Sequence, residues 1–378
     1  MAWQITGGRV LRDERIEPGE VMLAKGHITT AAPRARRFDA TGLLVMPGLV
    51  DLHGDAHERQ MQPRPGIGFP AALAMRDSAA QLLAAGITTA FLGVTLSWEP
   101  GLRGIEAWRV TLAAVEAARP HAACDLRVHC RFEAYNLDAL EEVLDDIAAG
   151  RVDLLAYNDH TPSIVKRRDN PVKVATYAER AGMGPQDFVA LAERVYTRSP
   201  EVPDAQRRLS EAAGAAGIPM LSHDDDTPDT RTAFRALGAT ICEFPMAESV
   251  AEAARTAGEH VVMGAPNVVR GGSHLGWSSA APLAERGLVT VLASDYYWPA
   301  MLEAAFVMAG RGAMDLAAAW SLVSANPAEA AGLTDRGRIA PGLRGDLVLV
   351  DPDRRAPVAT FAAGELAWLA PTATARSG

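Results

Sequence analysis

The sequence is poor in cysteine and has no surplus of positive charge. Its 378 residues include three cysteines, Cys124, Cys130 and Cys242, without a Cys-x-x-Cys spacing. An odd number of cysteines without that spacing argues against a disulfide framework and against a zinc ribbon. The low cysteine content fits a reducing compartment, so we expect a cytoplasmic protein.

Acidic residues outnumber basic ones, 46 to 37, and the formal net charge is -9. A chain without a general basic field does not attract polyanions, so nucleic acids and anionic membrane surfaces are not expected partners. Long hydrophobic runs are missing as well. No window approaches the roughly 18 uninterrupted apolar residues of a membrane span, and the first residues lack the basic-then-apolar order of a secretory signal. We expect a protein that is neither exported nor embedded in a membrane.

Apolar runs alternate along the chain with longer, alanine-rich stretches of helical character. This alternation is typical of repeated βα units with a parallel sheet. The strand-like runs are residues 45–52, 86–95, 125–135, 152–160, 217–225, 239–245, 260–267 and 288–297. Eight units predict an α/β fold with a (β/α)8 barrel over residues 45–334. Residues 161–201, a charged insertion between the fourth and fifth runs, are interpreted as a lid or a substrate loop.

Both ends of the chain differ from the middle. Residues 1–44 and 335–370 contain short strand-like segments with turns and lack helical spacing. We expect them to pair with each other in one small β-sandwich beside the barrel, although two unrelated hairpins would give the same pattern. Residues 371–378 are compositionally biased, and we expect a disordered tail.

Polar residues stand where the predicted strands end. In a parallel α/β barrel the reactive side chains lie at the carboxyl ends of the strands, so residues at these ends share one rim. A single histidine beside an aspartate is often only a hydrogen-bonded pair. Several such residues at one rim favour a metal site. The residues at this rim are His53, Asp55, Glu133, His160, His223, Glu243 and Asp295.

Imidazole and carboxylate groups are ligands of zinc, iron and manganese, and no cysteine is placed to compete with them. We therefore expect one or two divalent ions of this kind. The expected ligands are His53, Asp55, Glu133, His160, His223 and Asp295.

Three consecutive carboxylates follow His223 in the sequence. We expect Asp224, Asp225 and Glu243 to orient the imidazoles as hydrogen-bond acceptors, and residues 224–226 could alternatively offer a further cation site. A solvated acidic turn, or capping of the next helix by Asp226 or Thr227, would also explain the run.

Basic residues gather in a few loops of this otherwise acidic chain. Arg270 and His274 flank a Gly-Gly pair, where backbone amides can approach an oxyanion closely. The other basic residues in such loops are Arg64, Lys166, Arg167 and Arg168. Guanidinium and ammonium groups over a metal centre predict a phosphate or polyphosphate ligand. For residues 166–168 a solvated charge run is an equally good explanation.

Several of these segments together resemble a known family. The similarity is carried by LVMPGLVDLHGD, SHDDDT, EFP, MGAPNVVRGGSH, SDYY and the closing segment 326–351. It points to the amidohydrolase superfamily and, within it, to the PhnM family of the carbon–phosphorus lyase pathway. The resemblance implies a metal-bearing, distorted (β/α)8 barrel with a small β-sandwich built from both chain ends. It also implies the hydrolysis of α-D-ribose 1-methylphosphonate 5-triphosphate to pyrophosphate and the 5-phosphate, in phosphonate catabolism.

By position, His53 and Asp55 match the ligand pair of the first strand, with aspartate in place of the second histidine that is usual in the superfamily. Asp295 matches the aspartate of the eighth strand. The chain departs from the common pattern at two strands. The superfamily uses a carboxylated lysine or a glutamate on strand four and a histidine on strand six, whereas this chain has His160 and Glu243 there.

The resemblance implies metal-assisted hydrolysis of a phosphoanhydride, with Asp295 as the acceptor of the proton of the attacking water. The residues expected to bind the triphosphate are Arg64, Arg270, His274, Lys166 and Arg167. An enzyme that cleaves a C–N bond in a cyclic amide or an N-acyl amino acid could use the same centre, and a non-catalytic subunit of a pathway complex is a further alternative. A homo-oligomer is compatible with the sequence, and His57 has no assigned role.

Overall fold

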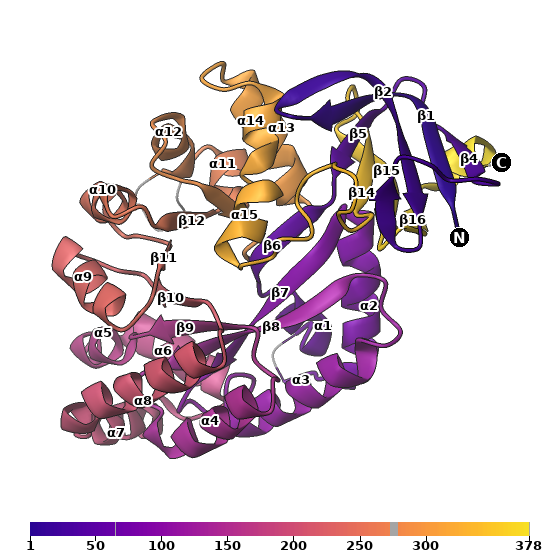
Figure 1. The fold of residues 1–378 in the computed structure, drawn as a ribbon. Helices are drawn as coiled ribbons and strands as arrows, with labels where there is room; N and C mark the ends of the chain where they lie inside the picture. Colours follow the sequence, from indigo (N-terminus) through magenta and orange to yellow (C-terminus); the bar gives the residue numbers. More distant parts are fainter. Residues whose placement is uncertain (65, 273–278, 378) are drawn as a thin grey trace.

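The computed structural model describes residues 1–64, 66–272 and 279–377. Two sheets organise the chain: a barrel of parallel strands surrounded by helices, and a second sheet built from both ends of the chain. Figure 1 shows the second sheet beside the barrel, with both termini on its side of the molecule. This arrangement confirms the predicted fold class.

Eight parallel strands form the barrel, and each overlaps one of the eight predicted runs. They are β6 (Leu49–Gly54), β7 (Ile87–Leu96), β8 (Asp125–Glu133), β9 (Leu154–Asn158), β10 (Met220–His223), β11 (Ile241–Glu243), β12 (His260–Gly264) and β13 (Val291–Ala293). The barrel closes between its first and last strands. Asp295 N–H donates to the His53 carbonyl at 2.8 Å, and Asp55 N–H donates to the Asp295 carbonyl at 3.0 Å.

Side chains that point into the barrel form one apolar cluster. It contains Val50 and Leu52 of β6 and Phe91 of β7, and Ala328 of α15 (Ala325–Ala330) packs against them. Parallel strands buried on both faces consist of nearly continuous apolar runs, which explains why these segments are recognisable in the sequence. Because the interior is filled, the polar side chains are left at the carboxyl ends of the strands.

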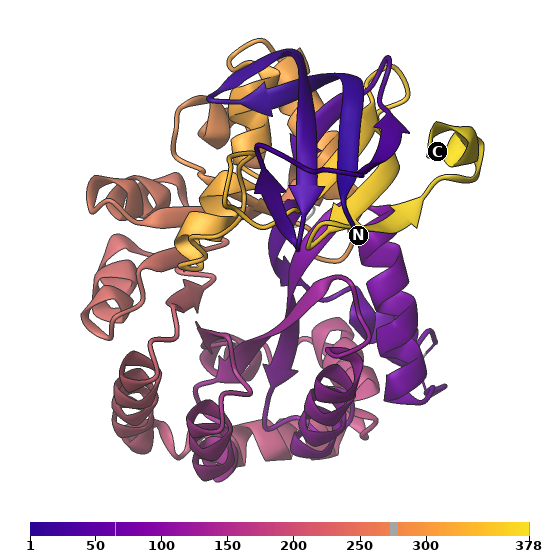
Figure 2. The same cartoon turned by 45° about the vertical axis from the view of Figure 1, so that its right-hand side comes forward.

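Helices cover the outside of the barrel (Figures 1 and 2). They are α1 (His57–Met61), α2 (Ala71–Ala84), α3 (Ile105–Ala118), η1 (Leu137–Ala139), α4 (Leu140–Ala148), α5 (Thr161–Lys166), α6 (Pro171–Ala181), α7 (Pro185–Tyr196), η2 (Ser199–Glu201), α8 (Val202–Ala215), α9 (Pro228–Ala236), α10 (Glu248–Thr256), α11 (Ala265–Arg270), α12 (Ala280–Glu285), α13 (Ala300–Gly310) and α14 (Leu316–Ser321), besides α15. Their apolar sides join the outer faces of the strands in one large cluster, in which Trp108 and Trp320 are fully buried. In the described chain, no helix is long and apolar enough to cross a membrane.

The second sheet, which we call the end sheet, unites the two chain ends. Its strands are β1 (Trp3–Arg12), β2 (Arg15–Ala24), β3 (His27–Thr29), β4 (Arg36–Asp39), β5 (Leu44–Pro47), β14 (Leu347–Asp351), β15 (Ala356–Ala362) and β16 (Glu365–Leu369). β5 pairs with β14, so the predicted association of the two ends is confirmed. The sheet folds over an apolar cluster in which the Phe361 ring lies 5.4 Å from Trp3 and 5.9 Å from Phe38.

One predicted boundary needs correction. The apolar run 45–52 was interpreted as a single barrel strand, but it contributes to two sheets: β5 belongs to the end sheet and β6 to the barrel. The chain turns at Gly48, where a Cβ atom would lie 2.4 Å from Thr88 Oγ1. The first part of the end sheet therefore extends to Pro47, beyond the predicted end at residue 44.

The tail also differs from the prediction. Residues 371–378 were expected to be disordered, whereas η3 (Pro371–Arg376) is a short helix in the structure. Ala373 is 1% exposed, and Arg376 Nη1 donates to the carbonyls of Asp39 at 3.1 Å and Thr41 at 2.9 Å. Packing on the end sheet orders this segment despite its biased composition.

The charged insertion 161–201 is helical and not an open loop. It contains α5, α6, α7 and η2. Its helices share a small apolar cluster that includes Ile164, Ala178 and Phe188.

The three cysteines, all within the described chain, are buried and unpaired, as expected.

Candidate metal centre

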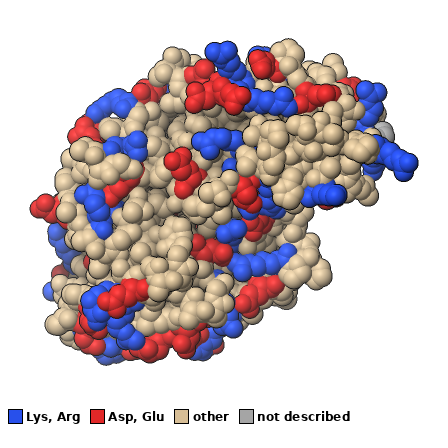
Figure 3. Space-filling view, in the orientation of Figure 1, with Lys and Arg blue, Asp and Glu red and all other residues tan. Residues whose placement is uncertain are grey.

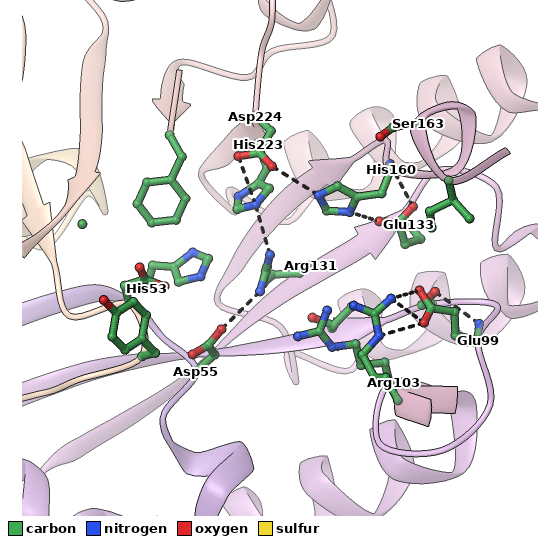
Figure 4. A pocket seen from close by; sticks show the side chains of 18 of the residues that line it. His53, Asp55, Glu99, Arg103, Arg131, Glu133, His160, Ser163, His223 and Asp224 are labelled. Carbon is green, nitrogen blue, oxygen red and sulfur yellow. Dashed lines mark hydrogen bonds and ion pairs between the residues drawn. The ribbon is translucent and has the colours of Figure 1, made fainter. Parts of the chain in front are cut away.

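A cavity of about 490 Å³ opens at the carboxyl ends of the barrel strands (Figure 4). Every barrel strand contributes to its wall. The wall includes His53 and Asp55 at β6, Thr95 and Ser97 at β7, Arg131 and Glu133 at β8, His160 after β9, His223 and Asp224 at β10, Phe244 at β11, Gly264 at β12 and Asp295 at β13. The structure therefore brings together all six predicted metal ligands.

Three histidines of this wall share one arrangement, in which Nδ1 faces a glutamate. His53 Nδ1 donates to Glu243 at 2.8 Å, and His223 Nδ1 donates to the other oxygen of the same carboxylate at 2.7 Å. His160 Nδ1 pairs with Glu133. A carboxylate that accepts from Nδ1–H fixes the tautomer and leaves the lone pair on Nε2, as is typical of metal-binding histidines. Glu243 thus orients imidazoles as a hydrogen-bond acceptor, as predicted. Glu133 was predicted as a metal ligand, but in the structure it accepts from Nδ1 of His160 in the same way.

Burial keeps two of these imidazoles neutral. It lowers the pKa of His53 to about 3 and lowers the pKa of His223 well below its ordinary value. Burial alone would also lower the pKa of His160, but Glu133 and Asp224 outweigh it and raise this pKa to about 10. Because a metal ligand must be a neutral imidazole, His53 and His223 are prepared for binding, whereas His160 first has to lose a proton.

Three groups of three side chains have ligand atoms that lie within 4.8 Å of one another. In the group His53, His223 and Glu243 the carboxylate already accepts a hydrogen bond from each imidazole, so the two other groups are the candidates for a cation. We call them the first position, formed by His53, Asp55 and Asp295, and the second position, formed by His160, His223 and Asp224. Nitrogen and oxygen donors of this kind suit a divalent transition metal. The side chains therefore fit a divalent ion.

Asp295 lies where the barrel closes, and its backbone has a positive φ of 53°. Asp224 at β10 (φ 60°) and Phe244 at β11 (φ 51°) share this conformation. Non-glycine residues keep a positive φ only where the surrounding structure imposes it, often at functional sites. Burial, followed by the charge of Asp55, raises the pKa of Asp295 to about 7, so this carboxyl group can exchange a proton near neutral pH.

Arg131, which the sequence analysis did not select, lies in the middle of the site (Figure 4). Its Nη2 donates to His223 Nε2 at 3.1 Å, and its Nη1 lies 3.6 Å from Asp55 Oδ2. The sequence did contain a signal. His129, Arg131 and Glu133 alternate along β8, and alternate residues of a strand point to the same face.

The structure brings Arg167 and Arg270, but not all predicted anion-binding residues, to the cavity wall. Arg64 lies exposed in the turn after α1, and Lys166 ends α5 on its exposed side; neither lines the cavity. For these two residues the structure does not support an anion contact, because position along the chain does not fix which side of a turn or helix faces the site. His274 lies outside the described residues.

Two arginines of the wall, Arg103 and Arg180, were not predicted. Arg180 of α6 binds Glu99 through Nε at 2.9 Å and Nη2 at 2.6 Å, and Arg103 Nη2 lies 3.5 Å from Glu58. Neither residue stands at the end of a strand, so a search of strand ends could not find them. The arginines that line the cavity are Arg103, Arg131, Arg167, Arg180 and Arg270.

Asp225 does not act on a cavity histidine as predicted. It is buried and faces Ser222 and Arg231, so it balances the charge of a fully buried guanidinium. Asp224 does face the cavity, with Oδ2 3.4 Å from Nε2 of His160. His57 is buried in α1 and does not line the cavity.

Basic and acidic side chains are interspersed over the face drawn in Figure 3. The cavity wall is mixed as well, because its five arginines lie beside five carboxylates, those of Asp55, Glu99, Glu133, Asp224 and Asp295.

Comparison with known proteins shows to which family this chain is similar. The model of the amidohydrolase family matches residues 44–368. Alpha-D-ribose 1-methylphosphonate 5-triphosphate diphosphatase of Escherichia coli (strain K12) is 32% identical over 362 residues, which cover 91% of this chain and 94% of the relative.

Solved structures with this fold include a beta-aspartyl dipeptidase from Fervidobacterium islandicum AW-1, with a TM-score of 0.65 at 14% identity over 97% of this chain and 96% of the other. N-acetylglucosamine-6-phosphate deacetylase from Pasteurella multocida has a TM-score of 0.63 at 12% identity over 97% of this chain and 99% of the other. At such low identity these likenesses show the fold alone. The family match spans most of the chain, and the chain therefore belongs to the amidohydrolase family, a family of hydrolases.

Proposed function

We propose that this chain is a metal-dependent diphosphatase that hydrolyses α-D-ribose 1-methylphosphonate 5-triphosphate to pyrophosphate and the 5-phosphate. The observation that carries the proposal is the set of five arginines around a cluster of metal-ligand side chains in one cavity. Guanidinium groups bind phosphoryl oxygens with two parallel hydrogen bonds, and a triphosphate offers many such oxygens. The name and the 32% identity of the Escherichia coli relative support the same substrate.

The ligand set favours zinc, iron or manganese, because imidazole and carboxylate donors suit these ions. A divalent ion held by His53, Asp55 and Asp295 would supply Lewis acidity and would lower the pKa of a water molecule. Asp295, which lies at the carboxyl end of the last barrel strand and lines the cavity, accepts the proton of the attacking water. The water oxygen forms the new bond to phosphorus, and the bridging bond to the departing pyrophosphate breaks.

The arginines of the cavity would bind the negatively charged triphosphate. Arg167 and Arg180 reach the cavity from the insertion, and Arg270 reaches it from α11. Placed around the triphosphate, they would balance the charge that develops on the leaving pyrophosphate. The insertion would then be a substrate-binding segment, as one of the two sequence interpretations had it. We further propose a cytoplasmic location, in line with three unpaired cysteines.

A hydrolase that cleaves a C–N bond would use the same metal ligands. A neutral cyclic amide offers the cavity arginines no anionic group and an N-acyl amino acid offers one carboxylate, whereas a triphosphate offers several phosphoryl oxygens. We therefore rank this alternative second, and a non-catalytic subunit third.

The deciding experiment incubates the metal-loaded protein with the ribose-phosphonate triphosphate, with nucleoside triphosphates and with a panel of cyclic and N-acyl amides. Phosphorus NMR follows the phosphates, and chromatography follows the amides. We expect release of pyrophosphate with the first compound at the highest kcat/KM. Hydrolysis of an amide without turnover of any triphosphate would overturn the proposal.

A further inference from the structure

Arg131 occupies the space between the two possible cation positions. It lies near the carboxyl end of β8, where its neighbours in register are Thr95 of β7 and Ala156 of β9. Gly93 lies beside it as well: a Cβ atom there would be 3.4 Å from Arg131 Cδ and 3.6 Å from His53 Nε2. These small neighbours accommodate a long side chain of which only 7% is exposed.

The second position is in conflict with this guanidinium group. His223 has one lone pair for an ion, on Nε2, because its Nδ1–H donates to Glu243. Arg131 Nη2 already donates to Nε2 at 3.1 Å. An ion about 2.1 Å from the same nitrogen would lie inside van der Waals contact with Nη2 and would face its positive charge.

The first position is free of this conflict and is rigid. His53 Nδ1–H donates to Glu243, which leaves Nε2 for an ion. The backbones of His53, Asp55 and Asp295 are hydrogen-bonded to one another where the barrel closes, at 2.8 and 3.0 Å. Arg131 contacts one oxygen of Asp55, and the carboxylate has a second oxygen for an ion.

We propose that this centre binds a single divalent ion, at His53, Asp55 and Asp295, and that Arg131 takes the place of a second cation beside His223. The inference rests on the metal dependence in the proposed function, and it concerns the number of ions and not the substrate. Arg131 would then supply a permanent positive charge that does not depend on metal supply, because a guanidinium group stays protonated.

The test counts ions without substrate. Protein stripped of metal is loaded with excess Mn²⁺ and desalted; elemental analysis gives the ions per chain, and electron paramagnetic resonance distinguishes isolated from exchange-coupled Mn²⁺. We expect one uncoupled ion per wild-type chain and two coupled ions in Arg131→Ala, where the second position becomes accessible. Arg131→Lys should keep one ion. Arg103→Ala, which removes another cavity arginine, should also keep one.

Two ions per wild-type chain would overturn the inference, as would a folded Arg131→Ala protein that still binds one. Should Arg131→Ala fail to fold, a second pair of variants decides. His223→Ala is expected to retain one ion, and His53→Ala is expected to retain none. Loss of the ion in His223→Ala would contradict the assignment. A chain with one ion that leaves the triphosphate intact would count against the proposed function alone.

Discussion

Glu243 accepts a hydrogen bond on each of its carboxylate oxygens, one from His53 and one from His223. It is fully buried, and the two imidazole rings that it holds are stacked with their centroids 5.7 Å apart. One side chain therefore fixes the tautomer and the orientation of two imidazoles that are 170 positions apart in the sequence, and one of them, His53, belongs to the first position.

The first prediction concerns this carboxylate. In Glu243→Gln one oxygen is replaced by an NH₂ group, which cannot accept from an Nδ1–H, so one of the two histidines loses its orientation. We expect metal affinity to fall by about 10- to 100-fold, as for other partners of metal-binding histidines. Competition with a chromophoric chelator measures the affinity. Glu248→Gln, the same change at an exposed ion pair with Arg286, serves as the control and should leave it unchanged.

Asp295 allows a second prediction at the scale of one residue. Asn keeps a neutral oxygen donor for the ion but cannot accept a proton, so Asp295→Asn should lower kcat by about 10²- to 10⁴-fold. Metal content and melting temperature should stay close to those of the wild type. Unimpaired turnover of the triphosphate would remove Asp295 from its role as the base.

Single residues also show what the sequence could not tell. The candidate ligands could be selected because histidines and carboxylates at strand ends converge on one rim in any parallel barrel, and the structure places them in one cavity. Arg131 was missed because a search for metal ligands passes over guanidinium groups, although its alternation with Glu133 along β8 placed both side chains on the same face. Arg64 and Lys166 show the opposite error: a basic residue close to the site in sequence can lie on the exposed side of its turn or helix.

At the scale of elements, the apolar run before His53 illustrates a limit of pattern reading. β5 and β6 are both fully buried, so their hydrophobicity is alike, and only the partner strands differ. Pairing of β5 with β14 joins residues about 300 positions apart. Hydrophobic pattern predicts that a strand exists, but it does not predict which of two sheets the strand joins.

The insertion, the second element of interest, gives a third prediction. Arg167 lines the cavity, whereas its neighbour Arg168 pairs with Glu193 at 3.3 Å. Loss of a charge-assisted hydrogen bond to phosphate costs about 1.5–3 kcal/mol. We therefore expect Arg167→Ala to raise KM for the triphosphate roughly 10- to 100-fold with a smaller change in kcat, as steady-state kinetics would show. Arg168→Ala is the matched control, and equal effects of the two changes would contradict a role of the insertion in binding.

At the scale of the whole molecule, the metal centre lies where the barrel closes. A parallel bridge between Gly54 and Asp295 joins the ends of β6 and β13. The end sheet ties the two ends of the chain together beside the barrel, through β5 and β14. An ion bound to His53, Asp55 and Asp295 would add a further link between the first and last strands.

Removal of the metal should therefore lower the stability of the entire chain. An ion that binds only the folded state stabilises it by about 2.7 kcal/mol when its free concentration is 100 times Kd. We expect a chelator to lower the melting temperature by several degrees in thermal unfolding followed by circular dichroism, and re-addition of the ion to restore it. His53→Ala, which lacks a ligand of the first position, should melt at the same temperature with and without the chelator. If the chelator left the melting temperature of the wild type unchanged, ion binding would not be linked to folding. The first and last barrel strands would then be joined by their backbone hydrogen bonds alone.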